Sequence, residues 1–208
     1  HDLRNPLNVA TGHVDLARNA DDADEHLDTI ADSLDRMETL IEDLLARARA
    51  DRGVDREPLS LGTIAREAWE GIDSADATLE LDADIELAAD PARLRQLFEN
   101  LFRNSVEHGS ATSRAQSDDA GDTVTVRVDT HDDGFFVADD GPGIPEEDRA
   151  EIFERGVTHA ADGNGYGLAI VADVADGHDW RVSAGESEDG GARFEISGIR
   201  SLADAQQV

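Results

Sequence analysis

Residues 139–144 read DDGPGI and directly follow the apolar run GFFVA at 134–138. A carboxylate at the end of a strand can accept a hydrogen bond from the amino group of adenine. The glycines after it allow backbone conformations and close approaches that side chains would block. A second glycine-rich stretch, GNGYGL at 163–168, opens a predicted helix. Because free N–H groups at a helix N-terminus attract anions, the two stretches together suggest a site for a phosphate-bearing ligand.

Two amide side chains precede these stretches on one predicted helix. Asn100 and Asn104 are four residues apart, in a helix that opens at Pro91 with Asp90 as its N-cap and runs to His108. Its other face is apolar and carries Leu94, Leu97, Leu101 and Val106. Two amides on one stripe can supply an oxygen to Mg²⁺ and donors to phosphate. Taken alone, they are equally compatible with ordinary solvent-facing residues.

The chain begins with a third polar cluster, HDLRNPL at residues 1–7. A carboxylate beside a histidine, as in His1 and Asp2, can hold one ring nitrogen protonated while the other attacks an electrophile. Asn5 lies four residues after His1 and therefore on the same helical face. A histidine next to an acid is common on surfaces, so this cluster by itself does not establish a catalytic site.

Apolar residues in the first fifty positions follow helical spacing and predict an antiparallel helical hairpin. The first stripe consists of Leu3, Leu7, Ala10, Val14 and Ala17, and the second of Leu27, Ile30, Leu34, Met37, Ile41, Leu44 and Ala48. A single hairpin leaves its seam half exposed, so we expect two copies to form a four-helix bundle. The alternative is that the seam packs on the second domain of the same chain.

The hydrophobic pattern of the sequence changes after a predicted linker at residues 53–60, which contains Gly53 and Pro58. The pattern beyond it predicts mixed α/β structure. Helices are predicted at 61–72, 91–108 and 166–176, strands at 78–81, 85–88, 123–130, 134–138, 180–184 and 192–197, and a polar loop at 109–122.

The composition excludes several classes of function. The chain has 18 basic and 48 acidic side chains and a formal net charge of −30, and every basic residue is arginine. Such a surface repels nucleic acids and anionic membranes. The absence of cysteine excludes disulfides and thiolate chemistry. With no apolar run of about 18–20 residues, we expect a soluble cytoplasmic portion without membrane contact, whose acidic surface resembles that of proteins from salt-accumulating halophiles.

The clusters and their order resemble the sensor histidine kinases of two-component systems. The matching motifs are the H-box at residues 1–7 (HDLRNPL), the N-box at 100–108 (NLFRNSVEH), the first glycine box at 139–144 (DDGPGI), the F-box at 152–154 (IFE) and the second glycine box at 163–171 (GNGYGLAIV). The resemblance implies an α+β fold, in which a dimeric helical hairpin at 1–52 precedes a two-layer α/β sandwich of the Bergerat ATPase type at 61–200, with a tail at 201–208.

The resemblance also implies a role for individual residues. It makes His1 the phosphoacceptor, Asp2 the acid that activates it and Asn5 the residue that positions water for dephosphorylation of a response regulator. Asp139 would read the adenine of ATP, and Asn104 would bind Mg²⁺. The further nucleotide-binding residues would be Asn100, His108, Gly141, Gly143, Ile144, Gly163, Gly165, Gly167 and Leu168. Residues 145–162 would form a mobile lid, with Phe153 packing it down, and the partners would be a second copy and a receiver domain.

Several positions depart from the family pattern, among them Asn164 and Tyr166 in the second glycine box, where threonine and leucine are usual. Glu107 and His108 stand where the family often has lysine and then tyrosine, so a lysine contact to phosphate is missing and an acid takes its place. We expect weaker ATP binding unless salt screens that charge. Two other functions stay open on the sequence: a Bergerat-type ATPase without phosphotransfer, and a degenerate kinase that acts as a dimeric scaffold.

Overall fold

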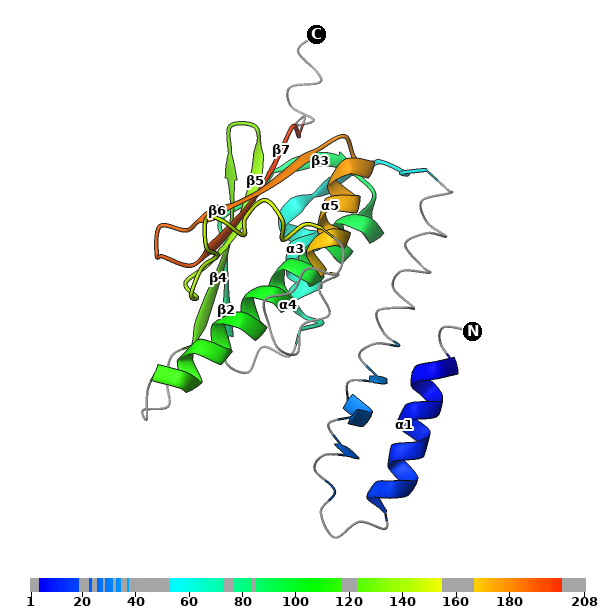
Figure 1. The fold of residues 1–208 in the computed structure, drawn as a ribbon. Coiled ribbons are helices and arrows are strands. Elements are labelled where there is room, and N and C mark those ends of the chain that lie inside the picture. The colour runs from blue at the N-terminus through cyan, green and yellow to red at the C-terminus, as the bar shows by residue number, and fades with distance from the viewer. Residues whose placement is uncertain are drawn as a thin grey trace. The chain divides into compact units, whose positions relative to one another are not determined.

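The structure is a computed structural model. It describes residues 4–18, 23, 26–27, 29–31, 33–34, 37, 53–72, 77–83, 85–116, 123–154 and 167–199, without the side chains of 4, 15, 108 and 110–116. The chain divides into two compact units, with the first boundary after Gly53. Figure 1 shows the helices and strands of both units.

The first unit contains helix α1, Arg4–Ala17, which confirms the first helix of the predicted hairpin (Figure 1). Pro6 lies in its first turn, where the absence of a backbone N–H is tolerated. The described residues between His26 and Met37 are also helical. The ring of His26 meets that of His13 edge-on, with 3.3 Å between their Nδ1 atoms, so the two segments are in contact at this level. The turn that joins the two helices of the predicted hairpin, at residues 19–24, lies largely outside the described residues.

Much of the apolar stripe in this unit is open to solvent in the single chain. Ala10 is buried, but Leu7, Leu27 and Leu34 are 52%, 54% and 52% exposed. Val14, from the same predicted stripe as Leu7, is also exposed. Large apolar side chains at regular helical spacing are seldom left in water, so these residues form a surface that a single chain does not cover.

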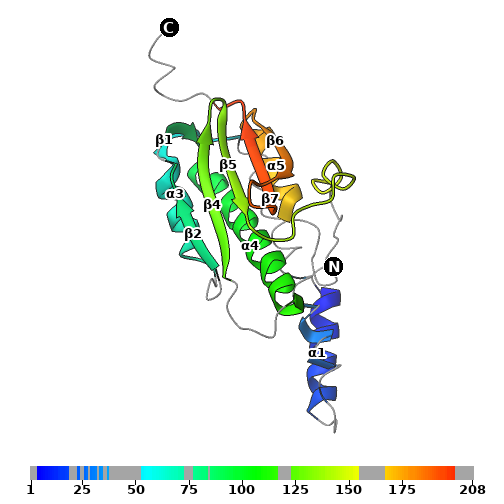
Figure 2. The ribbon, with the colours of Figure 1, turned by 90° about the vertical axis from the view of Figure 1, so that its left-hand side faces the viewer.

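The second unit is built on a mixed five-stranded sheet of order β2-β4-β5-β7-β6, in which only the β2–β4 pair is parallel. Figure 2 shows the helices on one face of this sheet. The strands are β1 Glu57–Ser60, β2 Ala77–Leu81, β3 Glu86–Ala89, β4 Val124–His131, β5 Gly134–Asp139, β6 Arg181–Glu186 and β7 Ala192–Ser197; the helices are α3 Leu61–Trp69, α4 Pro91–Gln116 and α5 Gly167–Gly177. The unit is a two-layer α/β sandwich, as predicted.

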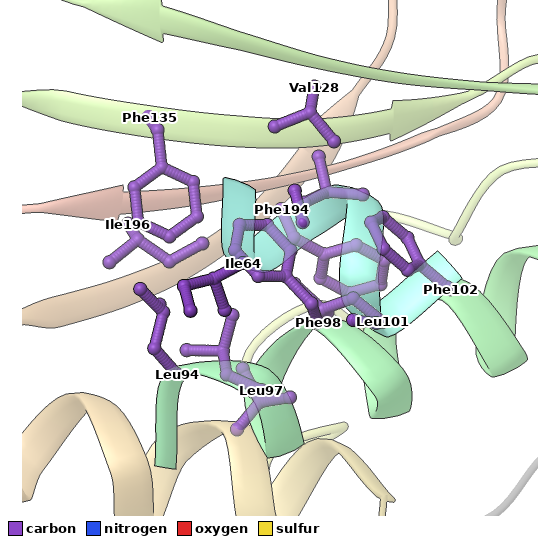
Figure 3. Packing of buried hydrophobic residues seen from close by; sticks show 14 of the residues in the cluster. Ile64, Leu94, Leu97, Phe98, Leu101, Phe102, Val128, Phe135, Phe194 and Ile196 are labelled. Carbon is purple, nitrogen blue, oxygen red and sulfur yellow. The ribbon is translucent and has the colours of Figure 1, made fainter. Parts of the chain in front are cut away.

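Alternating apolar residues on the strands form the core with the inner faces of the helices. Val124, Val126 and Val128 of β4 are buried, and the residues between them are partly exposed, as expected of a sheet with one covered face. Opposite them, Phe98 and Phe102 of α4 stack with ring centroids 5.4 Å apart (Figure 3). This continuous core fixes α4 against the sheet and thereby positions the polar side chains of that helix.

Helix α4 confirms its predicted start and extends beyond its predicted end. Asp90 Oδ1 accepts from the backbone N of Ala92 and Arg93, at 3.1 and 3.2 Å, and is the expected N-cap. The prediction of a polar loop from residue 109 is wrong as far as Gln116, since residues 109–116 continue α4. Gly109 is buried, and a Cβ there would lie 2.4 Å from Val124 Cγ2, so glycine allows the helix to pass close to this strand. Among the described residues, no helix is both long and apolar enough to cross a membrane.

The predicted linker at 53–60 is wrong for its second half. Residues 57–60 form β1, which pairs antiparallel with β3 in a separate two-stranded sheet. Pro58 suits a strand with only one neighbour, since its missing N–H can face away from the partner. Ser60 then caps α3, accepting from Thr63 N at 3.2 Å.

A buried histidine joins the start of α4 to the end of α5. His178 is 2% exposed, stacks on Trp180, donates from Nδ1 to the carbonyl of Val174 at 2.8 Å and accepts at Nε2 from Asp90 N at 3.0 Å. Burial lowers the pKa of His178 below its ordinary value of 6.5. Protonation at Nε2 would also place two donors against each other.

We therefore expect the free energy of unfolding to fall as the pH decreases from 6.5 through the lowered pKa of folded His178. The unfolded chain binds more protons than the folded chain in this range, so acid favours unfolding. Denaturant unfolding at several pH values, for the wild type and His178→Gln, measures this contribution. The variant should be less stable above pH 6.5 and lose less stability below it. Identical pH slopes would contradict the assignment.

Candidate nucleotide site

The candidate site is centred on the carboxylate of Asp139 at the end of β5. This side chain is 7% exposed and accepts three hydrogen bonds. Oδ1 accepts from Gly141 N at 3.1 Å and from Ala192 N at 2.9 Å, and Oδ2 accepts from Ser105 Oγ at 2.8 Å. A carboxylate can accept about four hydrogen bonds. Asp139 is therefore held in one orientation and keeps acceptor capacity on Oδ2.

The turn between β6 and β7 holds the backbone of Asp139 from a second side. Ser187 Oγ donates to the Asp139 carbonyl at 2.7 Å and accepts from Gly191 N at 2.9 Å. A Cβ on Gly191 would lie 2.1 Å from the Asp139 carbonyl oxygen, so only glycine fits there. The strand end that carries the carboxylate is thus fixed by backbone and side chain together.

Glycine is favoured at the two glycine positions of DDGPGI, residues 141 and 143, for different structural reasons. Gly143 has φ +73°, which favours glycine, and a Cβ there would meet the Gly190 carbonyl oxygen at 2.9 Å. A Cβ on Gly141 would lie 3.1 Å from Asp139 Oδ1. Ile144 is partly buried against the core, and its carbonyl accepts from Arg149 Nε at 2.9 Å. These contacts fix the turn that follows the carboxylate.

Helix α4 supplies the two predicted amides, and they differ in their surroundings. Asn100 is 8% exposed, donates from Nδ2 to the Gln96 carbonyl at 2.8 Å and lies against the first residue of α5, where a Cβ on Gly167 would be 3.2 Å from Asn100 Oδ1. Asn104 is partly exposed, and its side chain forms no hydrogen bond with any residue in the described part of the chain. Its amide oxygen is therefore available to a ligand.

The beginning of α5 and the segment after Ile144 both pack against the core of the second unit. Gly167 and Leu168 form the first turn of α5, and Leu168 is partly buried against the core. Residues 146–153 form turns, in which Ile152 is buried and Phe153 meets Phe194 edge-on at 6.5 Å. Phe153 thus packs the described part of this segment against the core, and the lid itself stays a prediction. Gly163, Gly165 and the rest of the predicted lid beyond residue 154 lie outside the described residues.

Of the remaining predicted site residues, the structure describes only some. Asn5 is exposed in the first turn of α1, whereas His1 and Asp2 lie outside the described residues. His108 is within α4, but its side chain is outside the description. No group of three or more histidine, cysteine or acidic side chains that could hold a metal occurs in the described ranges.

Sequence reasoning missed three residues that hold Asp139 in place: Ser105, Ser187 and Gly191. Ser105 lies among the apolar residues of α4, directly after Asn104, and carries no sequence signal of its own. Ser187 and Gly191 belong to SEDGG at 187–191, between two predicted strands. A turn of this composition suggests only a hairpin, but the antiparallel order of β5, β7 and β6 returns it to the end of β5.

Comparisons with known proteins assign the chain to a family. Residues 89–199 match the family model of histidine kinase-, DNA gyrase B- and HSP90-like ATPases, and residues 1–53 match that of the His Kinase A (phospho-acceptor) domain. The chain belongs to the sensor histidine kinases. Both halves of the kinase catalytic portion are therefore present, in the order predicted from the motifs.

Individual relatives agree with this assignment. The chain is 31% identical over 206 residues to the probable sensor histidine kinase TcrY of Mycobacterium tuberculosis, covering 90% of this chain and 42% of TcrY. It is 28% identical to the crystal structure of the ATP binding domain of PrrB from the same organism, with a TM-score of 0.50, covering 71% of this chain and 98% of that domain. Full-length ShkA in complex with AMPPNP is 27% identical, with a TM-score of 0.62, covering 97% of this chain and 45% of ShkA. The chain thus spans less than half the length of TcrY and of ShkA.

Proposed function

We propose that this kinase portion transfers the γ-phosphoryl group of ATP to His1 and then to an aspartate of a response regulator. The observation that supports it best is the joint occurrence of a phospho-acceptor domain, with His1 beside Asp2, and an ATPase domain with a buried, oriented Asp139. Dephosphorylation of the regulator, assisted by Asn5, would be a second activity of the same hairpin.

In this proposal the adenine amino group donates to the remaining acceptor position of Asp139 Oδ2. Gly141 and Gly143 keep the turn free of side chains where the base enters, Ile144 adds apolar contact, and the His108 ring stacks on the base. The phosphates lie toward the start of α5, whose free N–H groups favour negative charge. Asn100, Gly163, Gly165, Gly167 and Leu168 would line that side. The complex of ShkA with AMPPNP supports a nucleotide site in this fold.

The available residues fit a magnesium ion that arrives with the nucleotide. Mg²⁺ usually binds one or two protein oxygens and takes its other ligands from phosphates and water. Asn104, with an amide oxygen that has no partner in the described structure, suits such a site. When bound, the ion would neutralise charge on the β- and γ-phosphates.

The phosphoryl transfer itself needs few protein groups. A ring nitrogen of His1 forms a bond to the γ-phosphorus as the bond from that phosphorus to the β,γ-bridging oxygen breaks, and ADP leaves. Asp2 holds the opposite ring nitrogen protonated, so the attacking nitrogen keeps its lone pair. The phosphoryl group then passes from the imidazole to a carboxylate oxygen of the regulator. Most of the rate enhancement would come from positioning and charge neutralisation.

We also propose that two copies form a four-helix bundle through the first unit. The exposed Leu7, Val14, Leu27 and Leu34 support this, because pairing two hairpins would remove these side chains from water. A receiver domain would dock on the same bundle, near His1. The exposure of Asn5 leaves its amide available to such a partner.

Incubation with γ-labelled ATP and Mg²⁺ distinguishes this function from the two alternatives. The kinase should retain label on the protein that is stable in base and lost in acid, since a phosphorus–nitrogen bond is acid-labile. Rapid release of phosphate without labelled protein would instead identify an ATPase. A tight dimer that binds no nucleotide would identify a scaffold.

The charge of the chain leads us to propose adaptation to high salt. Most of the described ion pairs, such as Arg56 with Asp179 at 2.6 Å, lie at the surface, and a net charge of −30 leaves most acids without a basic partner. Repulsion between them weakens as the Debye length falls from about 10 Å at 0.1 M salt to about 3 Å at 1 M. We expect the melting temperature to rise steeply with KCl up to about 3 M. A flat profile would contradict this adaptation.

A further inference from the structure

Ser105 is a buried polar residue to which neither the motifs nor the proposed chemistry assigns a role. It is 1% exposed, on the face of α4 that meets the end of β5. Its hydroxyl donates to Asp139 Oδ2 at 2.8 Å. Because a serine hydroxyl has one proton, this bond uses its only donor. Ser105 therefore acts on the proposed adenine site through Asp139.

The two oxygens of Asp139 are held unequally. Oδ1 accepts from two backbone N–H groups, of Gly141 and Ala192, which fill its acceptor positions. Oδ2 accepts from Ser105 alone among the described residues. The last acceptor position of the carboxylate is thus on Oδ2, and the hydroxyl of Ser105 determines where the remaining lone pair of that oxygen points.

We infer that Ser105 is a positioning residue that sets the preference of this site for a 6-amino purine, an inference that rests on the proposed ATP-binding function. The remaining lone pair of Oδ2 suits the adenine amino group, which is a donor. A purine with a carbonyl at position 6 would bring an acceptor to Oδ2. Ser105 cannot relieve that repulsion, since its proton is already bonded to Asp139.

The surroundings of Ser105 make it a rigid support. Its helical neighbours Leu101 and Phe102 are fully buried, so α4 cannot shift locally without disturbing the core. From the opposite side, Ser187 fixes the Asp139 backbone but does not touch the carboxylate. Ser105 is accordingly the one described side chain that orients Oδ2. When a base displaces water from the site, the hydrogen bond from Ser105 becomes harder to replace.

Ser105→Ala tests this inference through the ratio of two affinities. Titration calorimetry with ATP and with inosine triphosphate, which differ at position 6 of the base, gives both dissociation constants in the presence of Mg²⁺. The loss of one hydrogen bond to a desolvated carboxylate should weaken ATP binding about tenfold. Inosine triphosphate gains nothing from that bond, so its affinity should change little and the preference for ATP should fall about tenfold.

The matched control is Ser60→Ala, the same change at the N-cap of α3, where Thr63 N donates to Ser60 Oγ. It should leave both affinities as in the wild type. If the alanine variant does not fold, the two affinities are compared between Ser105→Thr and Ser105→Val. Threonine and valine have the same shape, but only threonine carries a hydroxyl.

Three results would overturn the inference. If Ser105→Ala weakens the binding of ATP and of inosine triphosphate equally, Ser105 has a merely structural role. If neither affinity changes, Ser105 has no role in nucleotide binding. Wild-type protein that binds neither nucleotide would overturn the proposed ATP site as well. Because the wild type is measured in the same titrations, failure of the inference alone is distinguishable from failure of the proposed function.

Discussion

Asp139→Asn is expected to weaken ATP binding by about 100-fold and to leave the fold intact. The fold should tolerate the amide because its oxygen can still accept from Gly141 N and Ala192 N, as Oδ1 does now. The amide nitrogen then replaces Oδ2 and can donate to Ser105 Oγ, whose proton rotates away. The rotated hydroxyl of Ser105 can donate to a carbonyl of the preceding turn of α4, so the melting temperature should stay close to that of the wild type.

The same arrangement places a donor where adenine needs an acceptor. The adenine amino group would meet the amide NH₂, and the charge-assisted hydrogen bond would be lost together with its geometry. Such a bond contributes about 1.5–3 kcal/mol to binding, and leaving a buried donor unpaired costs about as much again. A 100-fold loss of affinity corresponds to about 2.7 kcal/mol, which is within the sum of these two effects. Asp140→Asn is the matched control, since Asp140 is exposed and, among the described residues, accepts a hydrogen bond from Thr125 N alone, at 2.9 Å. Equal ATP affinity in Asp139→Asn and the wild type would contradict the pocket assignment.

Asn5→Ala is expected to slow dephosphorylation of the response regulator by about 100-fold while autophosphorylation continues. Asn5 is exposed in the first turn of α1, where its amide can hold a water molecule in line with a phosphoaspartate on a docked regulator. It has no part in the transfer from ATP to His1 as proposed above. Losing it should therefore separate the two activities.

Both rates need to be measured on the same preparation of Asn5→Ala. Asn8→Ala removes another exposed amide, from the next turn of α1, and serves as the control. If regulator dephosphorylation is as fast in Asn5→Ala as in the wild type, then Asn5 has only a surface role. A parallel loss of autophosphorylation would show that it acts on His1 instead.

The elements of the second unit were predictable because their signals are local. Alternation in TVTVRVDT and in ARFEIS fixed β4 and β7 to within a residue or two, and Asp90 with Pro91 marked the start of α4. The errors occurred where tertiary contacts override such signals. Gly109 looks like a helix breaker but is a close-packing position against Val124, and Pro58 looks like a linker residue but lies in a short edge strand.

The site was predictable to the extent that its residues belong to compact motifs. Asp139, Asn100, Asn104 and the glycines of DDGPGI all carry their signal within a few positions of the sequence. Ser105 and Ser187 do not, because each acts only through Asp139, which is 34 residues from one and 48 from the other. Only the pairing of β5 with β7 and the packing of α4 on the sheet bring the three together.

The central claim is that His1 receives the phosphoryl group of ATP, and direct identification of the modified side chain tests it best. Wild-type protein incubated with ATP and Mg²⁺, then digested and analysed by mass spectrometry at alkaline pH, should carry phosphate on the peptide that contains His1. His1→Gln should bind ATP as the wild type does, since Asn100, Asn104 and Asp139 lie in the other unit, yet carry no phosphate. Phosphate on another of the seven histidines, or undiminished labelling of His1→Gln, would contradict the account.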